Sequence, residues 1–530
     1  MNNYDHNDAI EARRVALQAE LDAMKSATER NRLGQFATPT KLARDVLAHG
    51  VSLLEPATPI RFLDPAIGTG SFYSALLATS EAHSVISATG FEIDEHYGAP
   101  GQALWTETPL KIILADFTQK LPPVDENQRA TLLICNPPYV RHHHLSASDK
   151  ERLHVSAKEV ANVDFSGLSG LYCYFMALAN GWMSEGAIAG WLIPSEFMDV
   201  NYGHALKAYL LREVTLLQIH RFDPNDVQFD DALVSSAVVW FENKKPLSNH
   251  RVTFSYGGTM QAPTHTKSIA AKDLNLIDKW TKYPKSDPST PHDGYRLGDL
   301  FAIKRGIATG DNNFFIVAED KARSLNLPAR FLRPVLPSAR YVKSDEVLSD
   351  AAGMPLLEKR LFLIDCDRPE DELKCNHPEL WAYLQTGIKD VATRFLCSSR
   401  RLWYSQERRP AAPIVCTYMG RSDHDGRPFR FILNQSEATA TNVYLMLYPK
   451  PLVAKRLARG STGLRLFWEA LNSIDRDTLL GNGRVYGGGL HKLEPKELAN
   501  VPADHLAALL GLSNKPLDPL QYDFNEVFVA

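Results

Sequence analysis

Short apolar segments alternate with segments of helical spacing between residues 60 and 241, and this alternation limits the possible fold most strongly. A strand is predicted at 60–63 and a helix at 71–79. The later segments are predicted strands at 88–93, 111–114, 131–135, 187–193, 214–219 and 234–241, and a helix at 168–183. Strands that alternate with helices form a mostly parallel sheet covered on both faces. The sequence therefore predicts a doubly wound α/β domain.

The second part of the chain has a different organisation. A chain of 530 residues is long enough for two or three domains. The alternation stops after residue 241, residues 242–249 are polar, and three prolines lie between residues 282 and 293. We predict a first domain at 1–245, a linker at 246–294 and a second domain of short irregular elements at 295–530.

Composition excludes several classes of protein. The hydrophobic and charged fractions, 44% and 23%, are those of an ordinary globular protein. No apolar run approaches the roughly 20 residues that span a bilayer, and the polar, charged segment 1–29 is unlike a signal peptide. The six cysteines form no C-x-x-C pair, so we expect no metal site, no disulfide framework and a reducing cytoplasm. Since the net charge is -4, any basic surface must be local.

A turn with two glycines, Asp64-Pro65-Ala66-Ile67-Gly68-Thr69-Gly70, follows the first predicted strand and opens a helix. Glycines let the backbone approach a ligand closely, and ligands bind at the carboxyl ends of such strands. Glu92 and Asp116 end the next two strands, where they can accept ribose hydroxyls and an adenine amine, and Phe117 can cover the adenine ring. Acids at three successive strand ends favour a cationic sulfonium donor. The alternative is a plain strand-to-helix turn. NAD and ATP are disfavoured because both of their glycine motifs are missing.

The tetrapeptide Asn136-Pro137-Pro138-Tyr139 directly follows the apolar strand at 131–135. It combines an amide oxygen, a backbone carbonyl and an aromatic ring in one stiff turn. These groups suit the activation of a planar amino nitrogen, which is otherwise a poor nucleophile. The tetrapeptide therefore predicts methyl transfer to such a nitrogen, with a rigid structural turn as the alternative.

In the order of its motifs the chain resembles the gamma-class N6-adenine DNA methyltransferases, the TaqI-like type II modification enzymes. The motifs are Gln35-Phe36-Ala37-Thr38-Pro39, the turn at Asp64, Glu92-Ile93-Asp94, Ala115-Asp116-Phe117 and Asn136-Pro137-Pro138-Tyr139. The resemblance is specific over 35–241 and looser through 306–310 and 486–490. It implies a SAM-dependent methyltransferase domain with a Rossmann-like doubly wound sheet, followed by a mixed α+β target recognition domain, with double-stranded DNA between them.

The resemblance also implies residue roles. An adenine must leave the duplex to reach the donor. Tyr139 and Phe229 are expected to stack on this flipped base, while Asn136 and Pro137 accept hydrogen bonds from its amine. The residues expected to hold S-adenosylmethionine (SAM) are Thr38, Asp64, Ala66, Gly68, Glu92, Ile93, Asp116 and Phe117. The chain departs from the family pattern at Asp64, where many relatives carry Glu, and at 142–144, a run of three histidines without an assigned role.

Basic residues in the second domain are the predicted DNA contacts. In the stretch 390–410, aromatic rings lie between arginines, which combines phosphate binding with stacking. The predicted residues are Lys304, Arg305, Arg394, Arg400, Arg401, Trp403, Tyr404 and Arg408. The alternative for each cluster is a solvated charged face.

The sequence leaves other functions open. Asn-Pro-Pro-Tyr also serves enzymes that methylate a protein glutamine amide or an RNA base, and a non-catalytic DNA-binding module with a relic donor site is a further alternative. The large second domain favours long DNA. We expect a monomer without a membrane or metal, and a cognate restriction endonuclease encoded as a separate chain.

Overall fold

The computed structural model describes residues 3–79, 84–223, 226, 228, 235–285, 293–421, 427–457, 463–486 and 490–512. The chain divides into two compact units, Met1–Thr290 with Tyr486–Gly488, and Pro291–Val485 with Gly489–Ala530. Phe229, one of the predicted base-stacking residues, lies outside the described residues. Within the described part, no helix is both long enough and apolar enough to span a bilayer.

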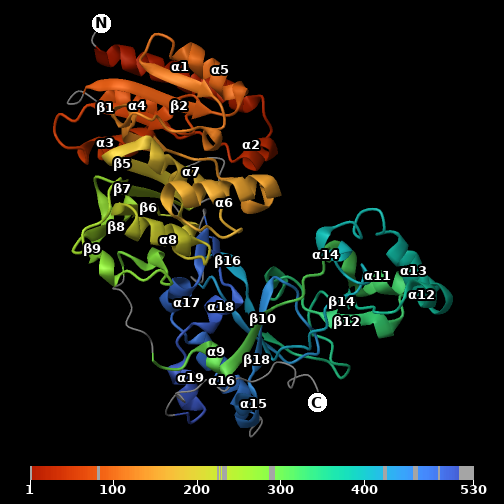
Figure 1. Cartoon of the computed structure of the whole chain (residues 1–530). Helices are drawn as coiled ribbons and strands as arrows, with labels where there is room; N and C mark the ends of the chain where they lie inside the picture. Colours follow the sequence, from red (N-terminus) through yellow and green to blue (C-terminus); the bar gives the residue numbers. More distant parts are fainter. Residues whose placement is uncertain are drawn as a thin grey trace. The chain divides into compact units, whose positions relative to one another are not determined.

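One large sheet forms the centre of the first unit (Figure 1). Its strands are β1 Ile60–Asp64, β2 Val85–Glu92, β3 Leu110–Leu114, β4 Ala130–Cys135, β5 Met183–Pro194, β6 Thr215–Arg221, β7 Ser236–Glu242, β8 Arg251–Gly258 and β9 Pro263–Ala270. Their order in the sheet is β3-β2-β1-β4-β5-β7-β6-β8-β9. The first five strands are parallel, and β7 runs antiparallel between β5 and β6. The predicted doubly wound domain is confirmed.

Helices cover both faces of this sheet. They are α1 Asn3–Ala23, α2 Ala27–Leu33, α3 Thr40–Ser52, α4 Ser71–Thr79, α5 Glu95–Leu104, α6 Ala147–Ala161, α7 Leu171–Ala179 and α8 Gly203–Arg212. Alternate residues of a strand point to opposite faces. In β4, Leu132 and Ile134 join the core beneath α3 and α4, while Leu133 and Cys135 join the core beneath α6, α7 and α8. Burial on both faces explains why β4 is a continuous apolar run.

The predicted linker at 246–294 is largely wrong, because β8 and β9 lie within it and extend the sheet. Val252 and Phe254 of β8 are buried, and Trp280 packs against Phe254 with ring centroids 5.9 Å apart. The polar residues at 242–249 concealed this strand pair in the sequence. The apolar residues that follow belong to the core of the first unit.

The second unit is built from short elements around three small sheets. Its strands are β10 Phe301–Arg305, β11 Ile316–Ala318, β12 Leu332–Val335, β13 Glu346–Val347, β14 Leu361–Ile364, β15 Ile414–Thr417, β16 Met419–Arg421, β17 Phe431–Asn434, β18 Tyr444–Pro449, β19 Arg484–Tyr486 and β20 Leu490–Lys492. The sheets have the orders β10-β18-β15-β17-β13, β11-β14-β12 and β16-β20-β19. The helices are α9 Leu297–Leu300, α10 Asn312–Phe315, α11 Glu319–Ser324, α12 Glu370–Asn376, α13 Pro378–Gln385, α14 Phe395–Ser398, α15 Pro451–Leu457, α16 Gly463–Asn472, α17 Arg476–Asn482, α18 Pro495–Ala499 and α19 Asp504–Leu509.

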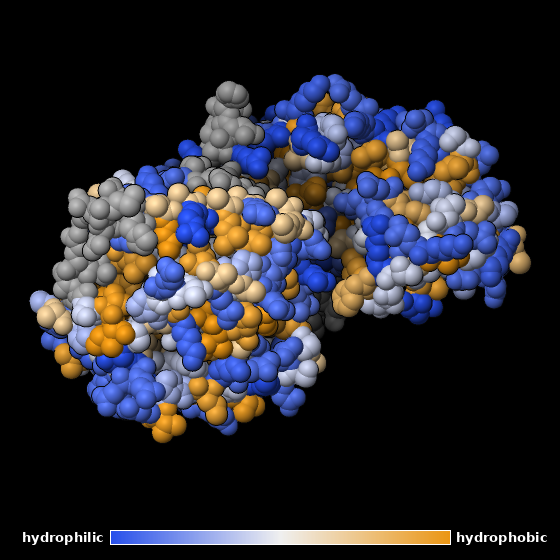
Figure 2. Space-filling model, turned by 90° about the horizontal axis from the view of Figure 1, so that it is seen from above, coloured by the Kyte–Doolittle hydropathy of each residue, from blue (hydrophilic) through white to orange (hydrophobic). Residues whose placement is uncertain are grey.

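Hydrophobic and hydrophilic residues are interspersed over the molecular face shown in Figure 2. Such a mixture is ordinary for a folded protein. A single exposed apolar side chain therefore needs further evidence before it indicates a binding surface.

Candidate active site

Polar residues that follow four neighbouring strands meet at one edge of the large sheet. Asp64 ends β1, Glu92 ends β2, Asp116 follows β3, and Asn136 follows β4. Since β2 and β4 flank β1 on opposite sides, the chain reverses its winding direction there, and ligands of doubly wound folds bind at this point. A pocket of about 730 Å³ opens there. The predicted residues that line it are Ala66, Gly68, Glu92, Ile93, Asp116, Phe117 and Asn136.

The turn after β1 leaves open space beside the backbone of Gly68. This residue has φ +56°, and no atom lies within 4 Å of the position that a Cβ would take. Its N–H donates to Glu92 Oε2 over 3.1 Å, and Glu92 Oε1 accepts the N–H of Asp94 over 2.8 Å. The carboxylate of Glu92 therefore stands at the pocket wall in a fixed orientation.

Burial makes two of the three acids of this edge, Asp64 and Glu92, difficult to ionise. Asp64 is only 2% exposed, and burial raises the pKa of its carboxyl to about 7, although hydrogen bonds from the Ala66 N–H and the Cys135 thiol oppose this rise. Burial also raises the pKa of Glu92, against hydrogen bonds from the backbone. A positively charged ligand nearby would favour the ionised carboxylates and so offset much of the cost of burying their charge. The acids therefore favour a cationic ligand.

In the side-chain amide of Asn136, the nitrogen is hydrogen-bonded and the oxygen is not. Its Nδ2 donates to the carbonyl oxygen of Phe36 over 3.0 Å and to Thr38 Oγ1 over 3.1 Å. Because a carbonyl only accepts, these bonds fix which end of the amide is nitrogen. The other end, Oδ1, is buried and has no hydrogen-bond partner among the described residues. A buried acceptor left in this state costs about 1–3 kcal/mol, so Oδ1 is suited to an external N–H donor.

Among the described residues, four predicted catalytic or SAM-binding residues do not line the pocket: Thr38, Asp64, Pro137 and Tyr139. Thr38 is buried and holds the Asn136 amide from behind. The Tyr139 hydroxyl donates to the carbonyl of Leu192 over 3.0 Å, and its ring is tilted against Phe36 at 5.8 Å between centroids. Burial raises the pKa of Tyr139, so its hydroxyl remains protonated and can keep this bond.

Asp116 and Phe117 are more fully engaged with the protein than their predicted contacts with adenine require. Oδ1 of Asp116 accepts from the N–H and hydroxyl of Thr118, and Oδ2 accepts from Gln119. Phe117 is 2% exposed and packs with Phe91 in the core. Both residues still line the pocket, and their predicted roles remain predictions.

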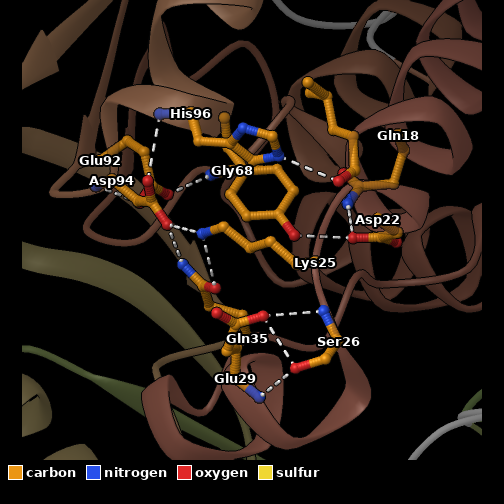
Figure 3. A network of polar contacts seen from close by, with 12 residues as sticks. Gln18, Asp22, Lys25, Ser26, Glu29, Gln35, Gly68, Glu92, Asp94 and His96 are labelled. Carbon is orange, nitrogen blue, oxygen red and sulfur yellow. Dashed lines mark hydrogen bonds and ion pairs between the residues drawn. The ribbon is translucent and has the colours of Figure 1, made fainter.

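A polar network between the N-terminal helices and the sheet edge was missed by sequence reasoning (Figure 3). Lys25 Nζ contacts Asp94 Oδ2, which also accepts from Gln35 Nε2 over 2.7 Å. Burial raises the pKa of Asp94, but the bonds from Lys25 and Gln35 outweigh it and hold the pKa below its ordinary value. On the other side, Tyr97 donates to Asp22 over 2.8 Å. The sequence indicated this network only through Gln35 and Asp94, which belong to the motifs Gln35-Phe36-Ala37-Thr38-Pro39 and Glu92-Ile93-Asp94.

This network closes one wall of the pocket. The pocket residues supplied by α1 and the segment after it are Gln18, Asp22, Lys25, Leu33, Gly34, Gln35, Phe36 and Ala37. Residues before the first strand therefore belong to the site.

The three histidines at 142–144 form a short 3-10 turn just beyond the Asn-Pro-Pro-Tyr segment. Within the described ranges, no group of three His, Cys, Asp or Glu side chains is placed to hold a metal ion. The turn still has no assigned role.

The predicted DNA contacts in the second unit are partly wrong. Tyr404 is fully buried and donates to the carbonyl of Arg368 over 2.6 Å. Trp403 is half-buried and packs against Phe314 with centroids 5.8 Å apart. The Tyr404 ring belongs to the core beside β11, β12 and β14 and is not presented for stacking, whereas Trp403 is only partly buried against that core and its predicted role remains a prediction. Sequence spacing alone did not show which side of the segment faces inward.

The predicted basic residues have mixed environments. Arg400 donates to the carbonyls of Ala308 and Thr309, and Arg408 contacts Asp365 and Asp367. Arg394 forms an ion pair with Asp311, and the guanidinium of Arg305 lies over the ring of Tyr418. Lys304 is half-buried in β10, and Arg401 is exposed.

Comparisons with known proteins agree with this architecture. Residues 102–228 match the family described as Eco57I restriction-modification methylase, and residues 289–517 match the C-terminal domain of type II methyltransferase M.Eco57I. Type II methyltransferase M.XamI of Xanthomonas campestris pv. amaranthicola is 28% identical over 89% of this chain and 85% of its own length. M.AccI of Acinetobacter calcoaceticus is 27% identical over 90% of this chain and 87% of its own length.

Among solved structures, the Type IIL restriction-modification enzyme MmeI in complex with DNA shares the fold. Its TM-score is 0.50 at 14% identity, over 96% of this chain and 76% of that one. Both matched families lie in the same order as the two units of this chain.

Proposed function

We propose that this chain, a type II modification methyltransferase and hence a DNA methyltransferase of a restriction-modification system, methylates N6 of an adenine flipped out of duplex DNA. The observation that carries the proposal is the unsatisfied Oδ1 of Asn136 at the end of β4. An amino group has hydrogens to donate to this oxygen. A carbon acceptor would leave it unsatisfied, and a hydroxyl would bring only one hydrogen to a turn that also presents the carbonyl of Pro137.

The residues present fit SAM as the methyl donor. The pocket is long enough to bring Asn136 together with Glu92 and Asp116 in one cavity of about 730 Å³. Gly68 leaves room for a ligand against the backbone, and Ile93, which is 70% exposed, offers an apolar face on the same wall. We propose that Asp64 and Glu92 attract the cationic end and the ribose, respectively, and that Asp116 binds the adenine amine.

The Asn136 amide then positions the acceptor. Its Oδ1 accepts one N6 hydrogen, and the carbonyl of Pro137 accepts the other. Both bonds draw the N6 lone pair out of conjugation with the ring and direct it along the pocket. When bound, SAM supplies an electrophilic methyl group on sulfur. The new N–C bond would form as the S–C bond of the donor breaks, so that the leaving group is a neutral thioether; N6 then loses one proton to water, and no covalent protein intermediate is required.

Stacking holds the flipped ring in this arrangement. We propose that Tyr139 contacts one face, with Phe229 on the other, although Phe229 lies outside the described residues. Each aromatic contact contributes about 1–3 kcal/mol. The bond from Tyr139 to Leu192 prevents free rotation of its ring.

Two features favour DNA over a protein amide or an RNA base. The second unit matches a domain of a type II methyltransferase over 229 residues, 289–517, and the sequence relatives are type II enzymes across both units. We propose that any cognate endonuclease is a separate chain and that the methyltransferase acts as a monomer.

The test is to express the chain in a host that lacks adenine methylation and to map modified bases by single-molecule sequencing. N6-methyladenine at one repeated motif is expected, and none is expected with Asn136→Ala. Methylation confined to N4 of cytosine would contradict the adenine assignment. Unmodified DNA from cells that contain folded, SAM-binding protein would contradict the whole proposal.

A further inference from the structure

Phe395 is the most exposed aromatic side chain in the described part of the protein. Its exposed fraction is 87%, whereas Tyr404, which was predicted to stack, is fully buried and Trp403 is partly buried against the same core. Phe395 is the first residue of α14, on the lobe that also contains α11 to α13 (Figure 1). Exposure alone carries little weight, so the manner in which the ring is held matters more.

The turn that carries Phe395 is anchored at three points to the loop 306–311. Cys397 is buried against Gly310, whose φ is +90° and whose absent Cβ would lie 2.5 Å from the Cys397 Sγ. Arg400 donates to the carbonyls of Ala308 and Thr309 over 2.8 and 3.0 Å. These contacts hold the backbone on both sides of an outward-facing ring. A preorganised ring loses little entropy on binding.

The third anchor also contributes to the local charge. Arg394 forms an ion pair with Asp311 over 2.7 Å and another with Asp390 over 3.2 Å. The charged residues of this turn and its anchors are the cations Lys389, Arg394, Arg400 and Arg401 and the anions Asp311 and Asp390. Four positive and two negative charges leave a net charge of +2. The turn that carries Phe395 therefore has a positive net charge together with its anchors.

We propose that Phe395 is a DNA-contacting wedge, which enters a groove of the bound duplex and packs on a base or sugar face. Arg401, which is exposed six residues further along the chain, contacts the flanking phosphates. This inference rests on the proposed DNA methyltransferase function. An apolar ring on a basic, rigid turn is the arrangement that proteins use to enter DNA, where the ring displaces water and the cations replace counterions. A protein-binding patch would require a broader apolar surface.

Binding assays on the full chain can separate the ring from the charge. The probes are a 25-base-pair duplex of mixed sequence and a second duplex that carries the motif found by sequencing, each titrated at several salt concentrations. Phe395→Ala is expected to weaken binding to the motif duplex at least about fivefold with an unchanged salt slope. Arg401→Ala is expected to reduce the slope of log K against log salt by about 1.

Matched variants make the result specific. Phe395→Trp should retain binding, and Leu466→Ala, which removes another exposed apolar side chain of the second unit, should bind as the wild type does. Equal affinity of Phe395→Ala and wild-type protein for both duplexes would overturn the proposal and direct attention to a protein partner. The proposal would also be overturned if Leu466→Ala lost as much DNA affinity as Phe395→Ala. SAM binding, measured separately by calorimetry, reports on the first unit, so a failed methyltransferase assignment is distinguishable from a failed wedge.

Discussion

The backbone N–H of Tyr139 donates to the carbonyl of Gly34 over 3.3 Å, and the position of a Cβ on Gly34 lies only 2.4 Å from that same nitrogen. The Asn-Pro-Pro-Tyr segment therefore packs against a residue 105 positions earlier, with no space for a side chain. Gly34 also ends α2 with φ +66°, in the left-handed region. Its contact holds the loop that supplies Phe36 and Thr38 to the Asn136 amide.

Gly34→Ala is expected to displace this loop. The new methyl group clashes with the Tyr139 backbone, and the positive φ adds strain, so we expect a loss of about 1–3 kcal/mol in the free energy of unfolding. The methylation rate should fall by more than the loss of folded protein explains, because the Asn136 amide loses its alignment. Urea denaturation and a methylation assay provide the two measurements. Gly167→Ala, with nothing within 4 Å of its new Cβ, is the matched control and should resemble the wild type.

Asn136→Ala is expected to reduce the methylation rate by at least about 100-fold while SAM binding changes little. The substitution removes the acceptor for the amine but none of the acids near the donor. One lost electrostatic contact at a reacting centre commonly costs this much. Single-turnover methylation and calorimetry report the two quantities. Near-normal turnover would eliminate the role assigned to Oδ1.

Thr38→Val tests a positioning role that differs from the predicted contact with SAM. The substitution removes one of the two acceptors of the Asn136 N–H bonds, which is worth about 1 kcal/mol. We expect kcat to fall about fivefold with an unchanged KM for SAM, and Thr38→Ser to restore it. A raised KM for SAM at constant kcat would instead favour direct contact with the donor.

SAM affinity should depend on pH through Asp64. In the free protein its pKa is about 7, above the ordinary 3.8, so the folded state holds the proton that a cationic ligand must displace. Below about pH 7 SAM binding therefore requires deprotonation, and affinity should rise from pH 5.5 to 7.5, by up to tenfold per pH unit. Calorimetry in buffers of different ionisation enthalpy should detect proton release. Asp64→Asn should bind SAM weakly, and its affinity should depend less on pH. If the variant kept the full pH dependence, Glu92 would be the titrating group.

The Asp64 carboxyl should also make the free energy of unfolding depend on pH, but this energy should fall as the pH rises, whereas SAM affinity should increase. A carboxyl whose folded pKa exceeds its unfolded pKa binds more protons when folded, so stability falls as pH rises from about 4 to about 7. The difference between 3.8 and about 7 corresponds to at most about 4 kcal/mol. Asp64→Asn should therefore be more stable than the wild type at pH 8 without SAM, and nearly equal to it at pH 4. Thermal unfolding at the two pH values measures this.

The strands, the doubly wound sheet and the acids at its edge could be predicted from local patterns. Apolar runs, glycine turns and the Asn-Pro-Pro-Tyr segment are short-range features, and parallel strands necessarily bring their carboxyl ends to one side. The same reasoning failed at β8 and β9, where the residues just before the strand pair are polar and β9 itself has mostly polar residues.

Three-dimensional packing alone decided which ends of side chains are left unsatisfied and which rings face solvent. The bonds from Asn136 to Phe36 and Thr38 join residues about 100 positions apart, and Lys25 reaches Asp94 across 69 positions. In the stretch 390–410, each ring could have faced either side. Burial of Tyr404 and exposure of Phe395 depend on the core beside β14, because orientation follows from the total burial of many residues and not from the spacing of a few.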